Sequence, residues 1–132
     1  MSKEFTFSKE EHLCGEKRIN RLFLEGEAFM SYPLRVVFLL EAKSDLNPVS
    51  VMVSVPKKRF KRAVKRNRLK RLMREAYRLN KFILADKLIE KNLQIHIAFN
   101  YVSNDELDFA AIEKKMKVAL GKMGEKIDLN IG

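Results

Sequence analysis

The chain has 132 residues and a formal net charge of +10 at pH 7, from 27 Lys and Arg residues against 17 Asp and Glu residues. This length suits one compact domain, and 46% hydrophobic with 33% charged residues is typical of a folded protein, not a disordered tail. The lone Cys14 excludes an internal disulfide framework. No signal peptide is visible and no apolar run reaches the roughly 18–20 residues that cross a bilayer, so we expect a cytoplasmic protein without a membrane partner.

The chain is expected to begin with an N-terminal arm and a short helix. Residues 1–14 form the predicted arm, whose apolar anchors are Phe5, Phe7 and Leu13. The short helix is predicted from Glu16 to Glu25, and Gly26 ends it. The apolar side of this helix carries Ile19, Leu22 and Phe23.

Residues 28–55 have strand character because they are rich in β-branched side chains. Pro33 separates a short edge strand at 29–32 from a longer strand at 33–42, and a polar turn leads to a third strand at 48–55. In the third strand valines alternate with serine and methionine, which predicts one apolar face. We expect these three strands in meander order.

The excess positive charge of the chain lies in one stretch. Between Lys57 and Arg74 there are eleven Lys or Arg residues and no Asp or Glu, which leaves 16 basic against 17 acidic residues, or −1, elsewhere. Such a block of like charge repels itself and is stabilised by a polyanion. Nucleic acid is the polyanion that this pattern favours.

The same stretch is predicted to continue as an amphipathic helix. Apolar residues recur at helical spacing, namely Leu69, Leu72, Met73, Ala76, Leu79 and Ile83. The opposite side collects polar residues flanked by Arg66 and Arg68, namely Asn67, Lys70, Arg71, Arg74, Arg78 and Lys81. Extended backward, the apolar phase would bury Arg62 and Lys65. The first turn therefore either overhangs the core or is still loop. A merely solvated face or a membrane-surface helix explains the pattern less well.

Residues 82–91 are expected to continue the helix or to break it briefly, and a fourth strand is predicted from Leu93 to Tyr101. One face of this strand carries Leu93, Ile95, Ile97 and Phe99. His96 lies on the other face. We interpret it as a hydrogen-bonded structural histidine, because the sequence suggests no carboxylate or nucleophile beside it.

A final helix is predicted after Ser103, because Ser103 and Glu106 have the spacing of a capping box. Its expected core residues are Phe109, Ile112, Met116, Ala119, Leu120 and Met123. The sequence shows no zinc-ligand spacing, no glycine-rich phosphate loop and no group of acids suited to a two-metal nuclease. We therefore expect binding chemistry, with no catalytic residue and no metal held by the protein.

The segment from Ala63 to Leu79, AVKRNRLKRLMREAYRL, closely resembles the signature of the protein component of bacterial ribonuclease P. That family shows an A-x-x-R-N-R-[IL]-K-R-L-x-R-E helix preceded by a basic pair, here Lys57-Lys58. The residues that match in register are Arg66, Asn67, Arg68, Lys70, Arg71, Arg74 and Glu75. The length and the order of the predicted elements are also similar to those of the family.

The resemblance implies an α+β fold, an α-β-β-β-α-β-α sandwich with a four-stranded sheet, similar to the ribonuclease P protein and ribosomal-protein-like folds. We expect a single RNA-binding domain over residues 1–132. The order of strands stays open, because the crossover through the basic helix leaves two possible neighbours for the fourth strand. A third and fourth strand in separate sheets would contradict this architecture.

The resemblance also implies a function. The chain would be the protein subunit of an endoribonuclease, ribonuclease P, that binds the catalytic RNA and the 5′ leader of precursor tRNA. The RNA would perform the Mg²⁺-dependent removal of the leader and bind most of the Mg²⁺. We expect one protein per RNA and a monomer when the protein is free.

The expected RNA-binding set joins the basic loop to the motif helix: Lys57, Lys58, Arg59, Lys61, Arg62, Arg66, Asn67, Arg68, Lys70, Arg71 and Arg74. Arginine suits this role because its planar guanidinium binds phosphate oxygens bidentately. The family's leader-binding cleft maps onto Ile19, Phe23 and Phe38. Ile19 departs from the aromatic that the family usually has, and His12 stands where the family commonly has Arg. Spacing alone also allows Phe23 to be a core residue.

Two other functions compete with this interpretation. A structural or ribosomal RNA-binding protein would share the basic surface but have no role in cleavage. A DNA-binding regulator would use the basic helix in a major groove, but it usually shows a helix-turn-helix pair or dimerisation heptads, and neither is visible.

Overall fold

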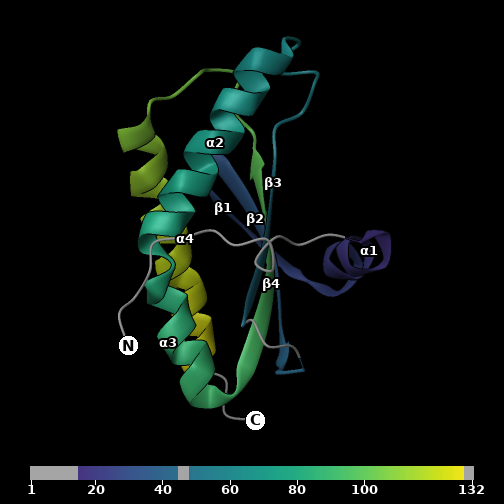
Figure 1. Ribbon diagram of the computed structural model, residues 1–132, viewed down its shortest axis with the longest axis vertical. Helices are drawn as coiled ribbons and strands as arrows, with labels where there is room; N and C mark the ends of the chain where they lie inside the picture. Colours follow the sequence, from purple (N-terminus) through teal and green to yellow (C-terminus); the bar gives the residue numbers. More distant parts are fainter. Residues whose placement is uncertain (1–14, 45–47, 130–132) are drawn as a thin grey trace.

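The computed structural model describes residues 15–44 and 48–129. Figure 1 shows a central sheet with helices against both of its faces. The elements are α1 (Glu16–Glu25), β1 (Glu27–Ser31), β2 (Leu34–Ala42), β3 (Val49–Ser54), α2 (Ala63–Asn80), α3 (Phe82–Lys91), β4 (Leu93–Tyr101) and α4 (Phe109–Leu129). The predicted α+β fold is confirmed, with α3 as a separate helix after a break at Lys81. The predicted arm at 1–14 lies outside the described residues.

The four strands form one sheet in the order β1-β2-β4-β3. β1 pairs with β2 and β2 with β4 in antiparallel fashion, whereas β3 and β4 are parallel. The predicted meander is therefore wrong at β3, because β4 is inserted between β2 and β3. The long connection through α2 and α3 makes this possible, since a parallel pair needs a crossover and its most buried strand takes a central place. Because β3 and β4 pair within one sheet, the result that would contradict the predicted architecture, two separate sheets, does not occur.

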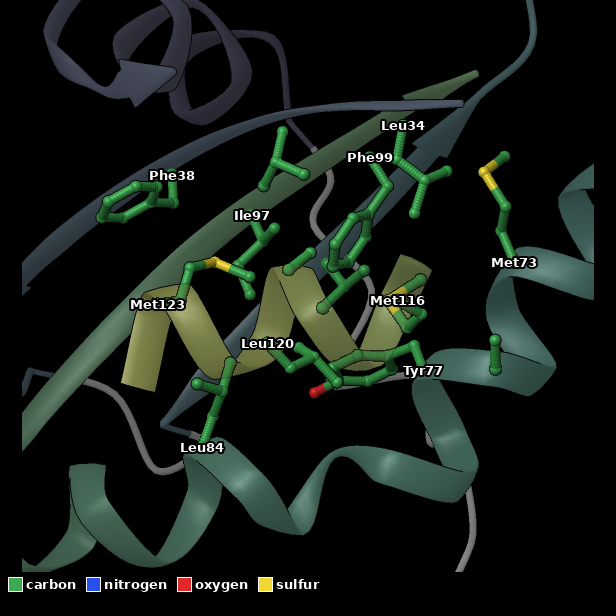
Figure 2. Close-up of a cluster of buried hydrophobic side chains, with 14 of the residues drawn as sticks. Leu34, Phe38, Met73, Tyr77, Leu84, Ile97, Phe99, Met116, Leu120 and Met123 are labelled. Carbon is green, nitrogen blue, oxygen red and sulfur yellow. The ribbon is translucent and has the colours of Figure 1, made fainter. Parts of the chain in front are cut away.

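The helices α2, α3 and α4 bury the larger apolar face of the sheet. Figure 2 shows sheet residues Leu34, Phe38, Ile97 and Phe99 facing Met73, Tyr77, Leu84, Met116, Leu120 and Met123 of the helices. The opposite face has a much smaller cluster, in which Leu22 of α1 packs on Val37 and Ala98. Ile19, Leu39 and Met52 are partly buried beside it.

The amphipathic pattern of α2 is confirmed in its central turns, where Leu69, Met73 and Ala76 are fully buried. The helix begins at Ala63, and Val64 is 79% exposed. Of the two alternatives that the sequence left open, the first turn therefore overhangs the core as helix. Tyr77 and Asn80 are also buried, although neither belongs to the predicted apolar stripe. Asn80 is satisfied there, since its Nδ2 donates to the carbonyl oxygen of Ala76 at 2.8 Å.

The predicted capping box of the last helix is wrong. The helix α4 begins at Phe109, and the Asp108 carboxylate accepts a hydrogen bond from the Ala111 amide at 2.9 Å, as an N-cap does. Ser103 instead accepts a bond from the Asp105 amide at 3.0 Å within the preceding loop. The buried Tyr101 hydroxyl binds that loop as well, and burial raises the pKa of Tyr101.

Gly26 ends α1 as predicted, because the backbone around it leaves no room for a side chain. A Cβ at this position would collide with the carbonyl oxygen of Leu22 and lie 2.8 Å from that of Phe38. The chain can therefore turn directly from the helix into β1 only with glycine there. Across residues 15–44 and 48–129, no helix combines the length and the apolar character needed to cross a bilayer.

Candidate nucleic-acid interface

The basic loop, residues 56–62, connects β3 to α2 at one end of the molecule (Figure 1). Phe60 fixes it to the core: the side chain is 7% exposed and its ring centroid lies 5.9 Å from that of Tyr101. Around this anchor the predicted RNA-binding residues point to solvent, namely Lys57, Lys58, Lys61 and Arg62. One aromatic contact therefore holds this cationic segment in a defined place.

Arg66 ties this loop to the helix that follows it. Its Nη1 donates hydrogen bonds of 2.8 Å to the carbonyl oxygens of Phe60 and Lys61. The sequence pattern assigned Arg66 to RNA alone, whereas the structure gives one end of its guanidinium a role in shaping the loop. Arginine carries five N–H donors, so the Nε and Nη2 groups remain for an anion.

A hollow of about 340 Å³ lies between the basic loop and the loop that precedes α4. Its lining residues are Arg59, Phe60, Lys61, Arg62, Lys65, Asn104, Asp105 and Glu106. Arg59 reaches across it and donates to Asn104 Oδ1 at 2.9 Å. No side chain of residues 15–44 and 48–129 caps the N-terminus of α2. Uncapped amides and clustered cations together favour a phosphate or another anion at this end.

Glu106 is an acid that faces the predicted RNA-binding set. It lies 3.4 Å from Lys65 and 3.4 Å from Arg68, both of which are about half exposed. Such exposed pairs are weak. The charge pattern of the basic stretch gives no sign of this acid, because Glu106 lies in a loop 38 residues beyond Arg68.

The outer side of α2 carries the rest of the predicted set. Asn67, Arg71 and Arg74 are exposed and Lys70 is half-buried, on turns whose other side buries Leu69, Met73 and Ala76. The one acid of the motif, Glu75, pairs with Arg78, whose Nε donates at 3.2 Å. The hydrogen bond from Arg78 lowers the pKa of Glu75. The acid is thus neutralised within its own helix and does not offset the arginines one turn earlier.

The three residues expected to line a leader cleft do not lie together. Phe23 on α1 is 45% exposed, so it is not a core residue, and Ile19 is partly buried against the sheet. Phe38 is 2% exposed and belongs to the core on the opposite face, where it meets the Phe29 ring edge-on at 5.9 Å. Its assignment to the cleft is wrong. The neighbouring Val37 faces α1 instead, since side chains alternate along a strand.

A polar network lies on the same sheet face as α1. The Glu41 carboxylate pairs with Arg21 of α1, and its Oε2 lies 2.9 Å from Nε2 of His96. Gln94 Nε2 donates to the same oxygen at 2.7 Å. The interpretation of His96 as a hydrogen-bonded histidine is confirmed, but a carboxylate does lie beside it. Sequence spacing gave no signal of this, because Glu41 and His96 are 55 residues apart and meet only across paired strands.

Clusters of metal-ligating side chains were looked for in the part of the chain that the structure describes. Within residues 15–44 and 48–129 no group of three or more His, Cys, Asp or Glu side chains could hold a metal ion.

Comparison with known proteins agrees with the sequence motif. The family model described as Ribonuclease P matches residues 7–124. The ribonuclease P protein component of Porphyromonas gingivalis strain W83 is 51% identical over 116 residues, which cover 88% of this chain and 85% of that protein. The protein component of Clostridioides difficile strain 630 is 32% identical over 111 residues, covering 84% of this chain and 90% of its own.

Solved structures share the fold. The RNase P protein of Staphylococcus aureus superposes with a TM-score of 0.68 at 18% identity, covering 86% of this chain and 94% of that one. That of Thermotoga maritima gives a TM-score of 0.67 at 22% identity, covering 85% and 96%. The motif on α2, the family model over most of the chain and the 51% identity lead to one conclusion: the chain belongs to the ribonuclease P protein component family.

Proposed function

We propose that the chain binds the catalytic RNA of ribonuclease P through the basic loop and the outer side of α2. It would also bind the 5′ leader of precursor tRNA on the sheet face beside α1. In this way it assists the endonucleolytic removal of the leader, which matures the 5′ end of tRNA. Membership of the family supports the partnership with an RNA subunit.

One observation carries the RNA-binding part of the proposal: the eleven cations between Lys57 and Arg74 occupy a stretch without a single acid. The buried side of α2 fixes the direction of the cations on this helix, because Leu69 and Met73 are fully buried on the other side. A rigid helix with arginines on one side suits a folded RNA, which proteins recognise mainly by shape and backbone.

The leader part rests on α1. Phe23 presents 45% of its surface to solvent, and an exposed aromatic ring offers a stacking platform for an unpaired base. The partly buried Ile19, Leu39 and Met52 give the surface around it apolar character. We call Phe23 together with these three residues the leader surface.

The chemistry of cleavage belongs to the RNA in this proposal. The protein contributes cations that lower the repulsion between two RNA molecules, and the RNA binds most of the Mg²⁺. One protein binds one RNA, and the free protein is a monomer. Because protein cations replace part of the counterion atmosphere, the protein lowers the Mg²⁺ concentration that cleavage requires.

The test is cleavage of precursor tRNA by a bacterial ribonuclease P RNA at low Mg²⁺, with and without the protein. We expect efficient cleavage at low Mg²⁺ only when the protein is present. A control at high Mg²⁺ shows that the RNA is active by itself. A protein that binds the RNA tightly but leaves cleavage at low Mg²⁺ unchanged would instead be a structural RNA-binding protein.

A further inference from the structure

Among the residues that the structure describes, the helix α1 has a narrow apolar attachment to the sheet. It is ten residues long and buries one side chain completely, Leu22, which packs on Val37 and Ala98. Ile19 adds a partial contact. In Figure 1 this helix lies on one face of the sheet, apart from α2, α3 and α4 on the other face. A single buried side chain resists lifting of the helix but does little to resist rotation about the contact.

A polar attachment supplies the second point. Arg21 comes directly before Leu22. Its Nε lies 3.2 Å from the Glu25 carboxylate of the same helix, and its Nη2 pairs with the Glu41 carboxylate on β2. The carboxylate is itself held from β4, where Gln94 donates to it at 2.7 Å and His96 Nε2 lies at 2.9 Å. Gln94 and His96 are 2% and 7% exposed, so these partners are fixed in the sheet.

The loop after β2 secures the network at its far end. The amide of Ser44 donates to Gln94 Oε1 at 2.8 Å, and Gln94 Nε2 also reaches the Ser44 hydroxyl at 3.2 Å. Glu41 and Gln94 are direct partners in the β2–β4 ladder. The Glu41 carboxylate is therefore held in place, and the position of the half-exposed Arg21 side chain follows from that of the carboxylate.

Helical geometry connects this pair to Phe23. Successive residues of an α-helix are about 100° apart around its axis. With Leu22 directed at the sheet, Arg21 and Phe23 emerge on opposite flanks of the contact. A rotation of α1 that releases Arg21 from Glu41 therefore changes the height of the Phe23 ring above the sheet. In such a rotation Arg21 and Phe23 would move as the two arms of a lever about the Leu22 contact, and we call this pair of side chains the lever.

We propose that Glu41 is a positioning residue: through Arg21 it fixes the rotation of α1 about Leu22 and so holds Phe23 where it stacks on a base of single-stranded RNA. This inference rests on the proposed leader surface. Gln94 and His96 act one step further back, since they hold the carboxylate. None of these four polar residues needs to touch the RNA.

A different role for Arg21 makes an opposite prediction. If Arg21 bound a leader phosphate directly, Glu41 would compete with the RNA for it. Removal of the Glu41 charge would then strengthen leader binding, whereas removal of Arg21 would weaken it. In the positioning role both changes weaken leader binding, because each one removes the ion pair between Arg21 and Glu41 that fixes the orientation of α1.

The experiment uses the protein assembled with a bacterial ribonuclease P RNA. Affinity is measured for precursor tRNA with a single-stranded leader and for the same tRNA without it, and the ratio is the leader factor. We expect Glu41→Gln and Arg21→Gln each to reduce the leader factor by about two- to tenfold, the range for a partly exposed, hydrogen-bonded ion pair. The double variant should lose no more than the stronger single variant. Lys17→Gln, which removes one positive charge one turn earlier on α1, should change the leader factor by less than about twofold.

A second readout needs no RNA. The chain contains no tryptophan, so Phe23→Trp introduces a single fluorescent reporter at the end of the lever. Adding Glu41→Gln to this reporter should shift its emission maximum, because the solvent exposure of the ring changes. Adding Lys17→Gln should leave the emission where it was.

Each contrary result has its own meaning. A leader factor that rises in Glu41→Gln and falls in Arg21→Gln would overturn positioning in favour of direct phosphate binding. An unchanged emission maximum, or equal losses for both substrates, would also overturn it and leave the network with a merely structural role. A wild-type assembly that binds both substrates equally would remove the leader surface itself. A wild-type leader factor that no variant alters would remove only the lever.

Discussion

The helices α1 and α2 both direct an apolar side at the sheet and a different side at solvent, but the sheet holds them with very different strength. The α2 helix is 18 residues long and buries Leu69, Met73 and Ala76 completely under α4 and the sheet. The α1 helix is ten residues long; within the described part of the chain, Leu22, a partial contact of Ile19 and one ion-pair network hold it. The long buried side of α2 makes this helix a rigid support for phosphate-binding side chains. The few contacts of α1 allow its orientation on the sheet to be adjusted.

The largest expected effect tests this difference in stability. Met73→Ala removes a fully buried side chain from α2 and should lower the free energy of unfolding by about 2–5 kcal/mol. Leu22→Ala should cost less, because α1 can detach while the main core stays intact. Urea unfolding of the two variants measures both losses. Equal losses would show that α1 is as integral to the core as α2.

Phe23 tests what α1 offers to RNA. Phe23→Ala should weaken binding of leader-bearing precursor tRNA by about 1–3 kcal/mol, the scale of one base–aromatic stack. Binding of the leaderless substrate and assembly with the catalytic RNA should be unchanged. Thermal unfolding provides the control, since a ring that is 45% exposed contributes little to the core. A large loss of stability with equal effects on both substrates would contradict the leader surface while leaving the role of α2 intact.

Arg66 tests how far the loop and α2 act as one platform. Arg66→Ala removes two hydrogen bonds from the guanidinium to backbone carbonyls and should lower the free energy of unfolding by about 1–2 kcal/mol. It should also weaken assembly with the RNA. The matched variant Arg74→Ala removes an exposed arginine of the same helix and should weaken assembly without that loss of stability. Denaturation and RNA titration of both variants separate the two roles, and equal stabilities would contradict the loop-shaping role of Arg66.

Salt dependence tests whether the outer side of α2 touches RNA at all. Each phosphate contact that is lost should flatten the log–log slope of affinity against salt by roughly 0.7–0.9. Arg71→Ala and Arg74→Ala should each show such a change in titrations over a range of salt concentrations. Lys17→Gln on α1 is the control and should leave the slope for the catalytic RNA as it was. An unchanged slope in all variants would show that this side of α2 makes no phosphate contact.

The smallest expected effect concerns the acid beside α2. Glu106→Gln removes the only partner that we identify for Lys65 and Arg68 in the described part of the chain, across two weak pairs at 3.4 Å. It should therefore alter the free energy of unfolding by less than about 1 kcal/mol. RNA binding should become slightly tighter, because two cations no longer share a carboxylate. Titration at low salt gives the clearest measurement, and weaker binding would indicate that Glu106 contacts the RNA itself.

The sequence by itself determined the features that depend on neighbours along the chain. The bounds of α1 from Glu16 to Glu25 and of β4 from Leu93 to Tyr101 agree with prediction, because apolar spacing, glycine and turn residues act locally. The apolar and basic sides of α2 follow from the same helical period. The family follows from the fixed positions of its motif.

Only the tertiary structure decided which distant segments meet. The insertion of β4 between β2 and β3 depends on a crossover whose partner no local period specifies. Val37, not Phe38, faces α1. Which of two successive strand residues points to a given face depends on the layer that covers that face, and not on which residue is aromatic. The pairs of Glu41 with His96 and of Glu106 with Arg68 join residues 55 and 38 positions apart. Such contacts arise when strands and loops pack together, since two charged side chains far apart in the sequence interact only after the fold has brought their backbones close.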